Sequence, residues 1–447
     1  MPAAVHIRKG SLIDGTGSEP IAGTDVVIVG DSIVRVGPTG TIDDAVPAGA
    51  TVIDATGTTI MPGLIDAHCH MTFDDVQSND ELFFHRPPAT AAMVTLFNLP
   101  KLLAAGVTSL LDPDTVMGIG PEIRAVVDSG AFPGPRISTG VQALLTSVGG
   151  TAGRLIPDEG KVGYAAVVNT RDEMVTETRR QIKNGADWIK IHATGSIPTR
   201  QGELQVWTLD ELKAVCDTAH DLGVPVTAHC RNASSTRDAA LAGVDLILHA
   251  SFMDDDGLEA IVEHGASLCP TFTFLANLAD HGERVGEGAG MQDIFRGEIK
   301  ATAAMRRKAH DAGVPLLCGS ESGFALTPYG HWHAREMEVF VEELGLTPVE
   351  AIACATRNGA IAMRMEGEIG VVAEGYRADV LVVDADPSRD VTVLQDRRNL
   401  RAVICRGEPV DLLRPWPERR RIPGEKVGSW AAEILTYERA MGAEDGR

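Results

Sequence analysis

Short apolar runs that stop at polar residues recur through the middle of the chain. Residues 60–65 form the first such run, and Asp66-x-His68-x-His70 follows it directly. Similar runs stop at Lys190, at His229, at His249 and at the segment Gly319-Ser320-Glu321-Ser322-Gly323. The carboxyl ends of parallel barrel strands meet at one face. The pattern therefore predicts that these polar side chains converge on a common site.

Strand-like and helical stretches alternate from about residue 59 to residue 364. The predicted strands end near His70, Asp112, Gly140, Lys190, His229, His249, Phe272 and Gly319. Thr208 and Glu211 predict a capping box at the start of an amphipathic helix, and residues 347–363 begin in the same way with Thr-Pro-Val-Glu. Eight strands that alternate with helices predict an α/β protein with a (β/α)8 TIM-type barrel.

Both ends of the chain show the alternating pattern of β-strands. Residues 26–37 are predicted to form two strands joined by a turn at Gly30 and Asp31. Further strands are predicted within residues 52–57, 375–384 and 400–407. Neither end alone has enough strands to bury a sheet face, so we expect the two ends to combine into one small β-sandwich.

These patterns predict that the chain is divided into three parts. Residues 1–58 and 365–412 are expected to form the β-sandwich, and residues 59–364 the barrel. Residues 413–447 remain as a C-terminal tail, in which residues 429–443 fit one amphipathic helix. We interpret the tail as a segment that wraps its own domain or a neighbouring subunit.

Charge and cysteine content narrow the possible partners. The formal net charge of −22 argues against nonspecific binding to nucleic acid or to anionic membranes, and the cluster at residues 419–421 is too short to change this. The 7 cysteines are scattered without Cys-x-x-Cys spacing, which favours a reducing compartment. Cys69 and Cys230 are interpreted as buried strand-end residues. The chain has no apolar segment of transmembrane length and no apolar leader, so we expect a cytoplasmic protein.

The paired histidines suggest a metal site. Extended backbone sends residues i and i+2 to the same side, so the imidazoles of His68 and His70 can bind one ion where the strand stops. Two spaced histidines alone are weak evidence, because such pairs are often ordinary surface or core residues. Lys190, His229 and His249, which end later strands, strengthen the interpretation.

The ordered set of motifs resembles the amidohydrolase superfamily of metal-dependent hydrolases. It is most similar to the branch with imidazolonepropionase-like and prolidase-like enzymes, which also contains phenylurea and carbamate hydrolases. The resemblance rests on Gly63–His70, Lys190, His229, His249, Gly319–Gly323, Ile13-Asp14-Gly15 and Gly375–Asp379. It extends from the N-terminal strands to about residue 410.

The resemblance implies a centre of two divalent ions in the barrel mouth. His68 and His70 would hold the more buried ion, and His229 and His249 the second. Lys190, carbamylated by carbon dioxide, would bridge them, since a carbamate binds cations and an ammonium does not. Zinc is the expected metal, with manganese, cobalt and iron as alternatives. A barrel lysine paired with a carboxylate is the alternative interpretation of Lys190.

Glu321 departs from the family pattern, which usually has Asp in this position. The extra methylene displaces the carboxylate by roughly an ångström, which matters where groups must be placed to within less than that. Glu321 is the predicted catalytic base, which takes a proton from the attacking water and returns it to the leaving nitrogen. A purely structural role for Glu321 remains open, as does the number of ions. Asp66 is expected to orient the ligands.

Residues in the loops after the strands are candidates for substrate binding. Arg231 can bind a carboxylate or a urea oxygen, with a salt bridge at the barrel rim as the alternative. His192 should point the same way as Lys190 and contact the substrate, with a histidine satisfied at the barrel rim as the alternative. Tyr329 and Trp332 are expected to line the mouth together with Phe272 and Phe274, or else to pack the loops together. The flexible segment at residues 146–153 is expected to form part of the pocket wall.

The leading functional hypothesis is hydrolysis of a carbon–nitrogen bond in a small amide, urea or carbamate. The alternative is a dipeptidase or N-acyl-amino-acid hydrolase, in which Arg231 would recognise a free carboxylate. A deaminase is less favoured, because Lys190 is unusual in such sites, and so is a non-catalytic relative, because the ligand positions are intact. The expected partner is a small-molecule substrate, and the resemblance implies a homo-oligomer.

Overall fold

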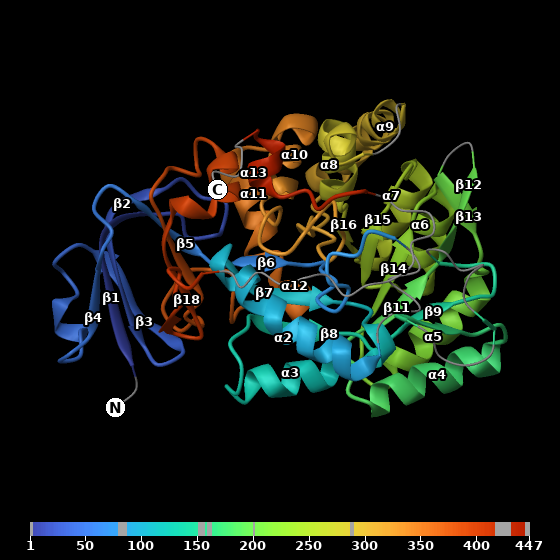
Figure 1. Ribbon diagram of the computed structural model, residues 1–447, viewed down its shortest axis with the longest axis horizontal. Helices are drawn as coiled ribbons and strands as arrows, with labels where there is room; N and C mark the ends of the chain where they lie inside the picture. Colours follow the sequence, from blue (N-terminus) through green and yellow to red (C-terminus); the bar gives the residue numbers. More distant parts are fainter. Residues whose placement is uncertain are drawn as a thin grey trace.

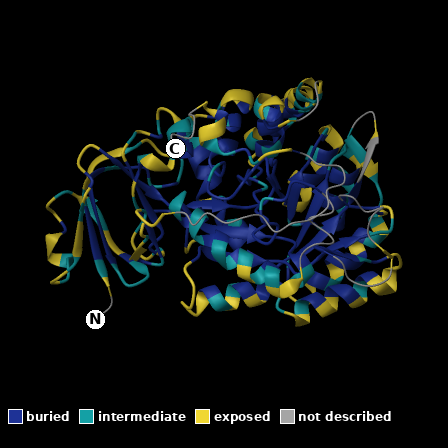
Figure 2. Cartoon of the chain, in the orientation of Figure 1, coloured by how far each residue is buried: buried dark blue, intermediate teal, exposed yellow. Residues whose placement is uncertain are grey.

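A sheet built from both chain ends lies beside a larger α/β part (Figure 1). The structure is a computed structural model, and it describes residues 3–78, 87–150, 157–158, 163–199, 202–286, 290–415 and 431–442. In Figure 2 the parallel strands of the larger part are mostly buried, and exposed residues concentrate on the outer faces of the helices, on loops and on several strands of the terminal sheet.

The terminal sheet has eight strands in the order β19-β18-β17-β5-β1-β2-β3, with β4 paired to β1. They are β1 (Ala4–Leu12), β2 (Ile21–Val29), β3 (Ser32–Pro38), β4 (Thr51–Asp54), β5 (Thr59–Pro62), β17 (Val380–Val383), β18 (Leu400–Cys405) and β19 (Glu408–Pro409). The two ends do combine, because β5 pairs with β1 on one side and with β17 on the other. In the described residues this gives one continuous sheet rather than two facing sheets, and β5 extends it past the predicted boundary at residue 58.

Alternate residues of the terminal sheet form its core. Val5, Ile7, Val26 and Ile28 pack with Val380 and its neighbours in one buried cluster. The period-2 alternation places such residues on one face, as expected from the sequence. The turn between β2 and β3 falls at Gly30 and Asp31, as predicted, and Gly30 has a φ of 57°.

The α/β part contains two parallel sheets. One has β6 (Leu64–Asp66), β7 (Val107–Asp112) and β8 (Arg136–Thr139). The other has β9 (Ala143–Leu145), β10 (Ala165–Val167), β11 (Ile189–His192), β14 (Val226–Cys230), β15 (Leu246–His249) and β16 (Ser267–Cys269). The hairpin strands β12 (Thr194–Thr199) and β13 (Gly202–Gln205) stand apart. The α/β class is therefore confirmed.

Backbone hydrogen bonds join the two parallel sheets. Residues 315–318 lie between β16 and β6, because Leu317 N donates to Leu268 O at 2.8 Å and Ala67 N donates to Cys318 O at 2.9 Å. At the other edge, Asp187 N donates to Thr139 O at 2.8 Å. The seventh predicted strand ends at Cys269 rather than near Phe272, which begins the next helix.

Helices follow most of the parallel strands. The α-helices of the described residues are α2 (Pro88–Ala104), α3 (Gly120–Asp128), α4 (Arg171–Lys183), α5 (Leu209–His220), α6 (Ala233–Ala242), α7 (Asp255–His264), α8 (Phe272–His281), α9 (Met291–Asp311), α10 (Arg335–Leu344), α11 (Pro348–Ala355), α12 (Ala360–Met363) and α13 (Tyr437–Ala440). Short 3-10 turns lie at Asp43–Ala45, Val116–Gly118, Gly282–Val285, Val391–Gln395 and Arg397–Asn399.

The predicted capping boxes are present at Thr208 and at Thr347. The helix expected over residues 347–363 is nevertheless divided, and α11 ends at Ala355. The interruption lies at Thr356, which has a φ of −130° and a ψ of −88°. A Cβ added at Gly359 would lie 2.6 Å from Cβ of Ile65, so glycine allows the chain to pack closely against β6.

The C-terminal tail differs from the expected single helix over residues 429–443. Of its described residues only Tyr437–Ala440 are α-helical. Ala432 N donates to Val285 O and Leu435 N donates to Ala325 O, both at 2.8 Å, so contacts with other loops take these backbone donors away from a helix. Residues 416–430 and 443–447 lie outside the described part of the chain.

Candidate metal centre

A small buried cavity opens at the carboxyl ends of the parallel strands. Its volume is about 20 Å³, enough for about one water-sized particle. It is lined by His68, His70, Phe73, Asp114, Tyr164, Lys190, His192, His229, Glu321 and Phe324. The sequence predicted most of its polar members, and the structure brings them together from distant parts of the chain.

His68, His249 and Glu321 form the first group of possible ligands. One ligand atom from each lies within 4.8 Å of the others. Neither ring nitrogen of His68 has a hydrogen-bond partner, nor has Nε2 of His249, whereas Nδ1 of His249 lies 2.7 Å from Oγ1 of Thr271. Burial lowers the pKa of His68 and of His249 well below the usual value. The two imidazoles are therefore neutral, with lone pairs available for an ion.

Glu321 is held in the left-handed backbone region, with a φ of 55°. Its backbone N–H donates to His68 O at 2.7 Å, and its carbonyl oxygen accepts from Thr327 Oγ1 at 2.7 Å. Burial raises the pKa of Glu321, against the opposing effect of His70 and Arg231. A buried carboxylate with a raised pKa is suited to accept a proton near neutral pH.

Asp112 and Asp114 form a second group with His70, which sequence reasoning missed. Nδ1 of His70 lies 2.8 Å from Oδ1 of Asp114 and 3.9 Å from Oδ1 of Asp112. Burial raises the pKa of Asp112 well above its usual value, and the neighbouring Asp114 adds to this. The signal was visible, since Asp112-Pro113-Asp114 ends β7 in the same way that the chosen histidines end their strands.

Lys190 is buried beside Asp114, and its Nζ lies 3.8 Å from Oδ2 of that carboxylate. Burial lowers the pKa of Lys190, and Asp114 opposes the shift. Burial acts to raise the pKa of Asp114, but Lys190 and His70 hold it well below its usual value. His192 lines the same cavity, with Nε2 at 3.4 Å from Oδ2 of Asp114.

His229 is oriented by Glu203, a residue of the β12–β13 hairpin that was not predicted. Nε2 of His229 lies 2.9 Å from Oε2 of Glu203, which also accepts from Thr194 Oγ1 at 2.8 Å. Burial acts to raise the pKa of Glu203, but His229 and Arg231 lower it to about 2. A carboxylate on one ring nitrogen fixes the tautomer and leaves Nδ1 of His229 for an ion.

Asp66 ties the end of β6 to the loop that carries Glu321. It accepts hydrogen bonds from the backbone N–H of His68 at 3.2 Å and of Ser320 at 3.0 Å. Nδ1 of His333 lies 2.7 Å from Oδ2 of Asp66. Since Nε2 of His333 accepts from Gly330 N, the proton sits on Nδ1 and is donated to Asp66. This is the orienting position expected for Asp66.

The predicted substrate contacts lie in different places. Arg231 Nη2 donates to Glu298 Oε1 at 2.7 Å, and its Nε lies 3.7 Å from Glu203 Oε1. The hydroxyl of Tyr329 donates to His70 O at 2.5 Å, which holds the backbone of the loop after β6 in place. Trp332 Nε1 donates to Leu435 O at 2.8 Å.

Trp332 and Tyr329 are 2% and 1% exposed, and neither lines the cavity. Trp332 packs into a cluster with the C-terminal segment instead. Phe272 stacks under the Arg306 guanidinium, and Phe274 contacts Phe324 edge-on. The aromatic lining consists of Phe73, Tyr164 and Phe324. Residues 151–153 of the expected pocket wall lie outside the described residues.

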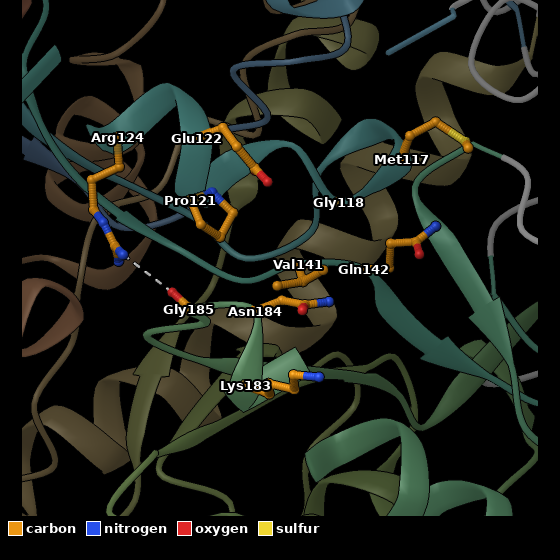
Figure 3. A pocket seen from close by; sticks show the side chains of 10 residues that line it. All are labelled: Met117, Gly118, Pro121, Glu122, Arg124, Val141, Gln142, Lys183, Asn184 and Gly185. Carbon is orange, nitrogen blue, oxygen red and sulfur yellow. Dashed lines mark hydrogen bonds between the residues drawn. The ribbon is translucent and has the colours of Figure 1, made fainter. Parts of the chain in front are cut away.

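A second hollow lies between α3 and the end of α4 (Figure 3). Arg124 points into it and donates to Gly185 O at 3.2 Å. It contains no histidine and none of the predicted site residues. A further group of possible ligands, His6, Asp25 and Asp43, lies in the terminal sheet, whereas the other two such groups of the described residues lie at the strand ends.

An α/β protein with buried, neutral imidazoles and carboxylates at its strand ends has the features of a metal-dependent hydrolase. Comparison with known proteins agrees. The model of the Amidohydrolase family matches residues 59–410. The chain therefore belongs to the amidohydrolase family and is an enzyme that acts on carbon–nitrogen bonds.

Individual relatives cover most of the chain. An ochratoxinase of Aspergillus niger is 27% identical over 453 residues, which span 96% of this chain and 88% of that protein. An uncharacterised protein of Mycobacterium bovis is 30% identical over 363 residues, 80% of this chain and 87% of that protein. A solved Xaa-Pro dipeptidase with methionine in its active site has a TM-score of 0.78 and 26% identity, covering 91% of this chain and 99% of that chain.

Divalent metal binding, which the family implies, fits the residues of the cavity and the neighbouring His249. The buried nitrogens of His68 and His249 lack protein partners, and unsatisfied buried polar atoms are costly unless a ligand or ion completes them. All 7 cysteines are buried and unpaired. In the described part of the chain no helix is both long and apolar enough to span a bilayer.

Proposed function

We propose that this enzyme hydrolyses the carbon–nitrogen bond of a small amide, urea or carbamate, using water activated at a divalent metal centre. The observation that carries the proposal is the convergence of unpartnered imidazole nitrogens of His68 and His249 with Glu321. Neutral nitrogen ligands and a carboxylate with a raised pKa are the groups that metal-assisted hydrolysis needs.

We assign the metal ligands to His68, His70, Lys190, His229 and His249. Lys190 is proposed to be carbamylated, because carbon dioxide reacts with a neutral amine and burial lowers the pKa of this one. The expected metal is zinc, as two ions. We also propose that the strands close into a (β/α)8 barrel and that the protein is cytoplasmic and homo-oligomeric.

Each residue has a defined part in the reaction. A divalent ion supplies Lewis-acid polarisation of the scissile carbonyl and a water that is activated near neutral pH. Glu321 accepts the proton of that water as the oxygen attacks the carbonyl carbon. It then donates this proton to the leaving nitrogen when the carbon–nitrogen bond breaks. His192 and the aromatic wall of Phe73 and Phe324 contact the substrate and exclude water.

The second candidate is a dipeptidase, favoured by the similarity to the solved Xaa-Pro dipeptidase. In that reading Arg231 binds the free carboxylate of the substrate. The contacts of Arg231 favour the first candidate, because two carboxylates, those of Glu298 and Glu203, already surround this one guanidinium. A substrate carboxylate would add a third negative charge beside it.

Paired substrates test the two candidates. The zinc-loaded enzyme is assayed on neutral amides, ureas and carbamates and on matched N-acyl amino acids and dipeptides. We expect hydrolysis of the neutral compounds, and a loss of kcat/KM in Arg231→Ala that is as large on neutral as on carboxylated substrates, because Glu203, which orients His229, loses its arginine partner. Arg237→Ala, which changes an arginine of α6 paired with Asp238, is the control. A loss confined to carboxylated substrates in Arg231→Ala establishes the dipeptidase instead, and no hydrolysis of either set by metal-loaded enzyme refutes the proposal.

A further inference from the structure

The loop after β7 brings a carboxylate into the cavity that the proposed ligand set does not use. Asp114 is 1% exposed and lines the cavity beside His70 and Lys190. Its Oδ1 lies 2.8 Å from Nδ1 of His70. The ligand atoms of His70, Asp112 and Asp114 all lie within 4.8 Å of one another, so a single ion can reach the His70 nitrogen and the Asp114 oxygen together.

Charge balance also requires a cation at this point. The described structure places the Lys190 ammonium 3.8 Å from Oδ2 of Asp114, but carbamylation of Lys190 converts that cation into an anion. Buried carboxylates without a cationic partner are strongly disfavoured, and a divalent ion supplies the missing charge.

Glu321 does not fill this position. Its carboxylate groups with His68 and His249, whereas the carboxylates that group with His70 come from Asp112 and Asp114. Of these two, Asp114 lines the cavity and Asp112 does not. Asp112 instead accepts from the backbone N–H of Asp114 at 3.3 Å, which holds the loop in place.

We propose that Asp114 is a further ligand of the metal centre and binds the ion held by His70. This assignment rests on the proposed metal-dependent function only in requiring that the cavity holds an ion. The centre then has an oxygen ligand from the loop after β7, in addition to the carbamate of Lys190. The extra negative charge favours a divalent cation in a cavity otherwise rich in neutral imidazoles.

Metal binding itself is the test. The wild-type enzyme and Asp114→Asn are stripped with chelator and titrated with Co²⁺, and bound metal is measured by visible absorption and elemental analysis. Asp114→Asn is expected to lose one ion or to bind it at least about 10-fold more weakly, taking the loss from an outer-shell partner as the lower limit. Equal stoichiometry and affinity in Asp114→Asn and wild type overturn the assignment.

Asp379→Asn is the matched control, because Asp379 is a buried carboxylate that pairs with Arg136 Nε at 2.7 Å and belongs to no group of possible ligands in the described residues. We expect it to bind Co²⁺ as wild type does. An equal loss of binding in Asp379→Asn and Asp114→Asn means that the loss follows from general destabilisation, which also overturns the assignment.

Asp114→Cys gives a direct signal of coordination. A thiolate bound to Co²⁺ adds a charge-transfer absorption in the near ultraviolet relative to wild type, and its absence from the Co²⁺-loaded variant counts against Asp114. If neither variant folds, a crystal structure of the zinc-loaded wild type decides. An ion about 2.0–2.2 Å from an Asp114 oxygen supports the assignment, and a carboxylate that contacts only Lys190 and His192 overturns it.

The readout separates this inference from the proposed function. Metal binding that depends on Asp114, in an enzyme that cleaves no amide, urea or carbamate, supports the ligand and refutes the function. If the enzyme cleaves such substrates and Asp114→Asn leaves its metal content unchanged, the proposed function is supported and the assignment of Asp114 as a ligand is refuted.

Discussion

Replacing Asp66 by Asn should destabilise the protein strongly, although the two side chains have nearly the same shape. Asp66 Oδ1 accepts two backbone N–H groups, and an Asn oxygen can keep both. Oδ2 accepts from Ser320 Oγ and from His333 Nδ1. In the Asn variant this position becomes an NH2 donor, which faces the N–H donor of His333.

His333 cannot relieve this conflict by changing its tautomer. Its Nε2 accepts from Gly330 N at 3.0 Å, so moving the proton to Nε2 breaks that bond instead. The variant therefore loses a charge-assisted hydrogen bond, worth about 1.5–3 kcal/mol, and leaves a buried donor unsatisfied at a cost of about 1–3 kcal/mol. We expect a decrease of about 3–5 kcal/mol in the free energy of unfolding.

Urea unfolding of metal-free protein, followed by circular dichroism, measures this decrease. Asp245→Asn is the control, because Asp245 also pairs with a histidine, His220, at 2.8 Å. Unlike Asp66 and His333, these two side chains are 40% and 39% exposed to solvent. The control should cost under about 1 kcal/mol. If Asp66→Asn costs no more than Asp245→Asn, the tautomer argument is wrong.

Two further changes test the surroundings of the ligands. Glu203→Gln should weaken metal binding or activity by about 10–100-fold, because Gln offers the His229 ring no charged acceptor. Co²⁺ titration measures metal binding and kcat/KM measures activity. The control Asp238→Asn, on α6, should change neither. The metal-free protein should lose stability as pH falls below 6.5, the ordinary pKa of His68 and His249, because the unfolded chain then binds protons that the buried, neutral rings do not. Urea midpoints that stay constant from pH 7 to pH 5 would contradict this.

The sequence allowed residues at the ends of predicted strands to be selected as site candidates, but not the residues that contact and orient them. His68, Lys190 and His229 could be selected because residue type and strand position are both local properties of the sequence. Asp114 shows the same local signal and was overlooked beside more familiar ligand types. Glu203 has no such signal, because its place depends on how the β12–β13 hairpin docks, with Glu203 N donating to Arg231 O at 3.0 Å.

Long-range packing also explains why Trp332 is not at the cavity. Its loop position could be predicted, but the C-terminal segment that covers it lies 103 residues away in sequence. The tail itself was expected to be helical from its pattern, and the backbone bonds of Ala432 and Leu435 to other loops decided otherwise. Both outcomes depend on contacts that periodicity does not encode.

The pairing of Arg231 connects substrate choice to the metal centre. Glu203 contacts both His229, a proposed ligand, and the guanidinium of Arg231. A substrate carboxylate that displaced Glu203 from Arg231 would disturb the acceptor that orients His229, and displacement of Glu298 would also break its bond from Ser251 Oγ. Carboxylated substrates would therefore weaken the ligand arrangement as they bind, whereas a neutral amide, urea or carbamate can enter while these contacts stay intact.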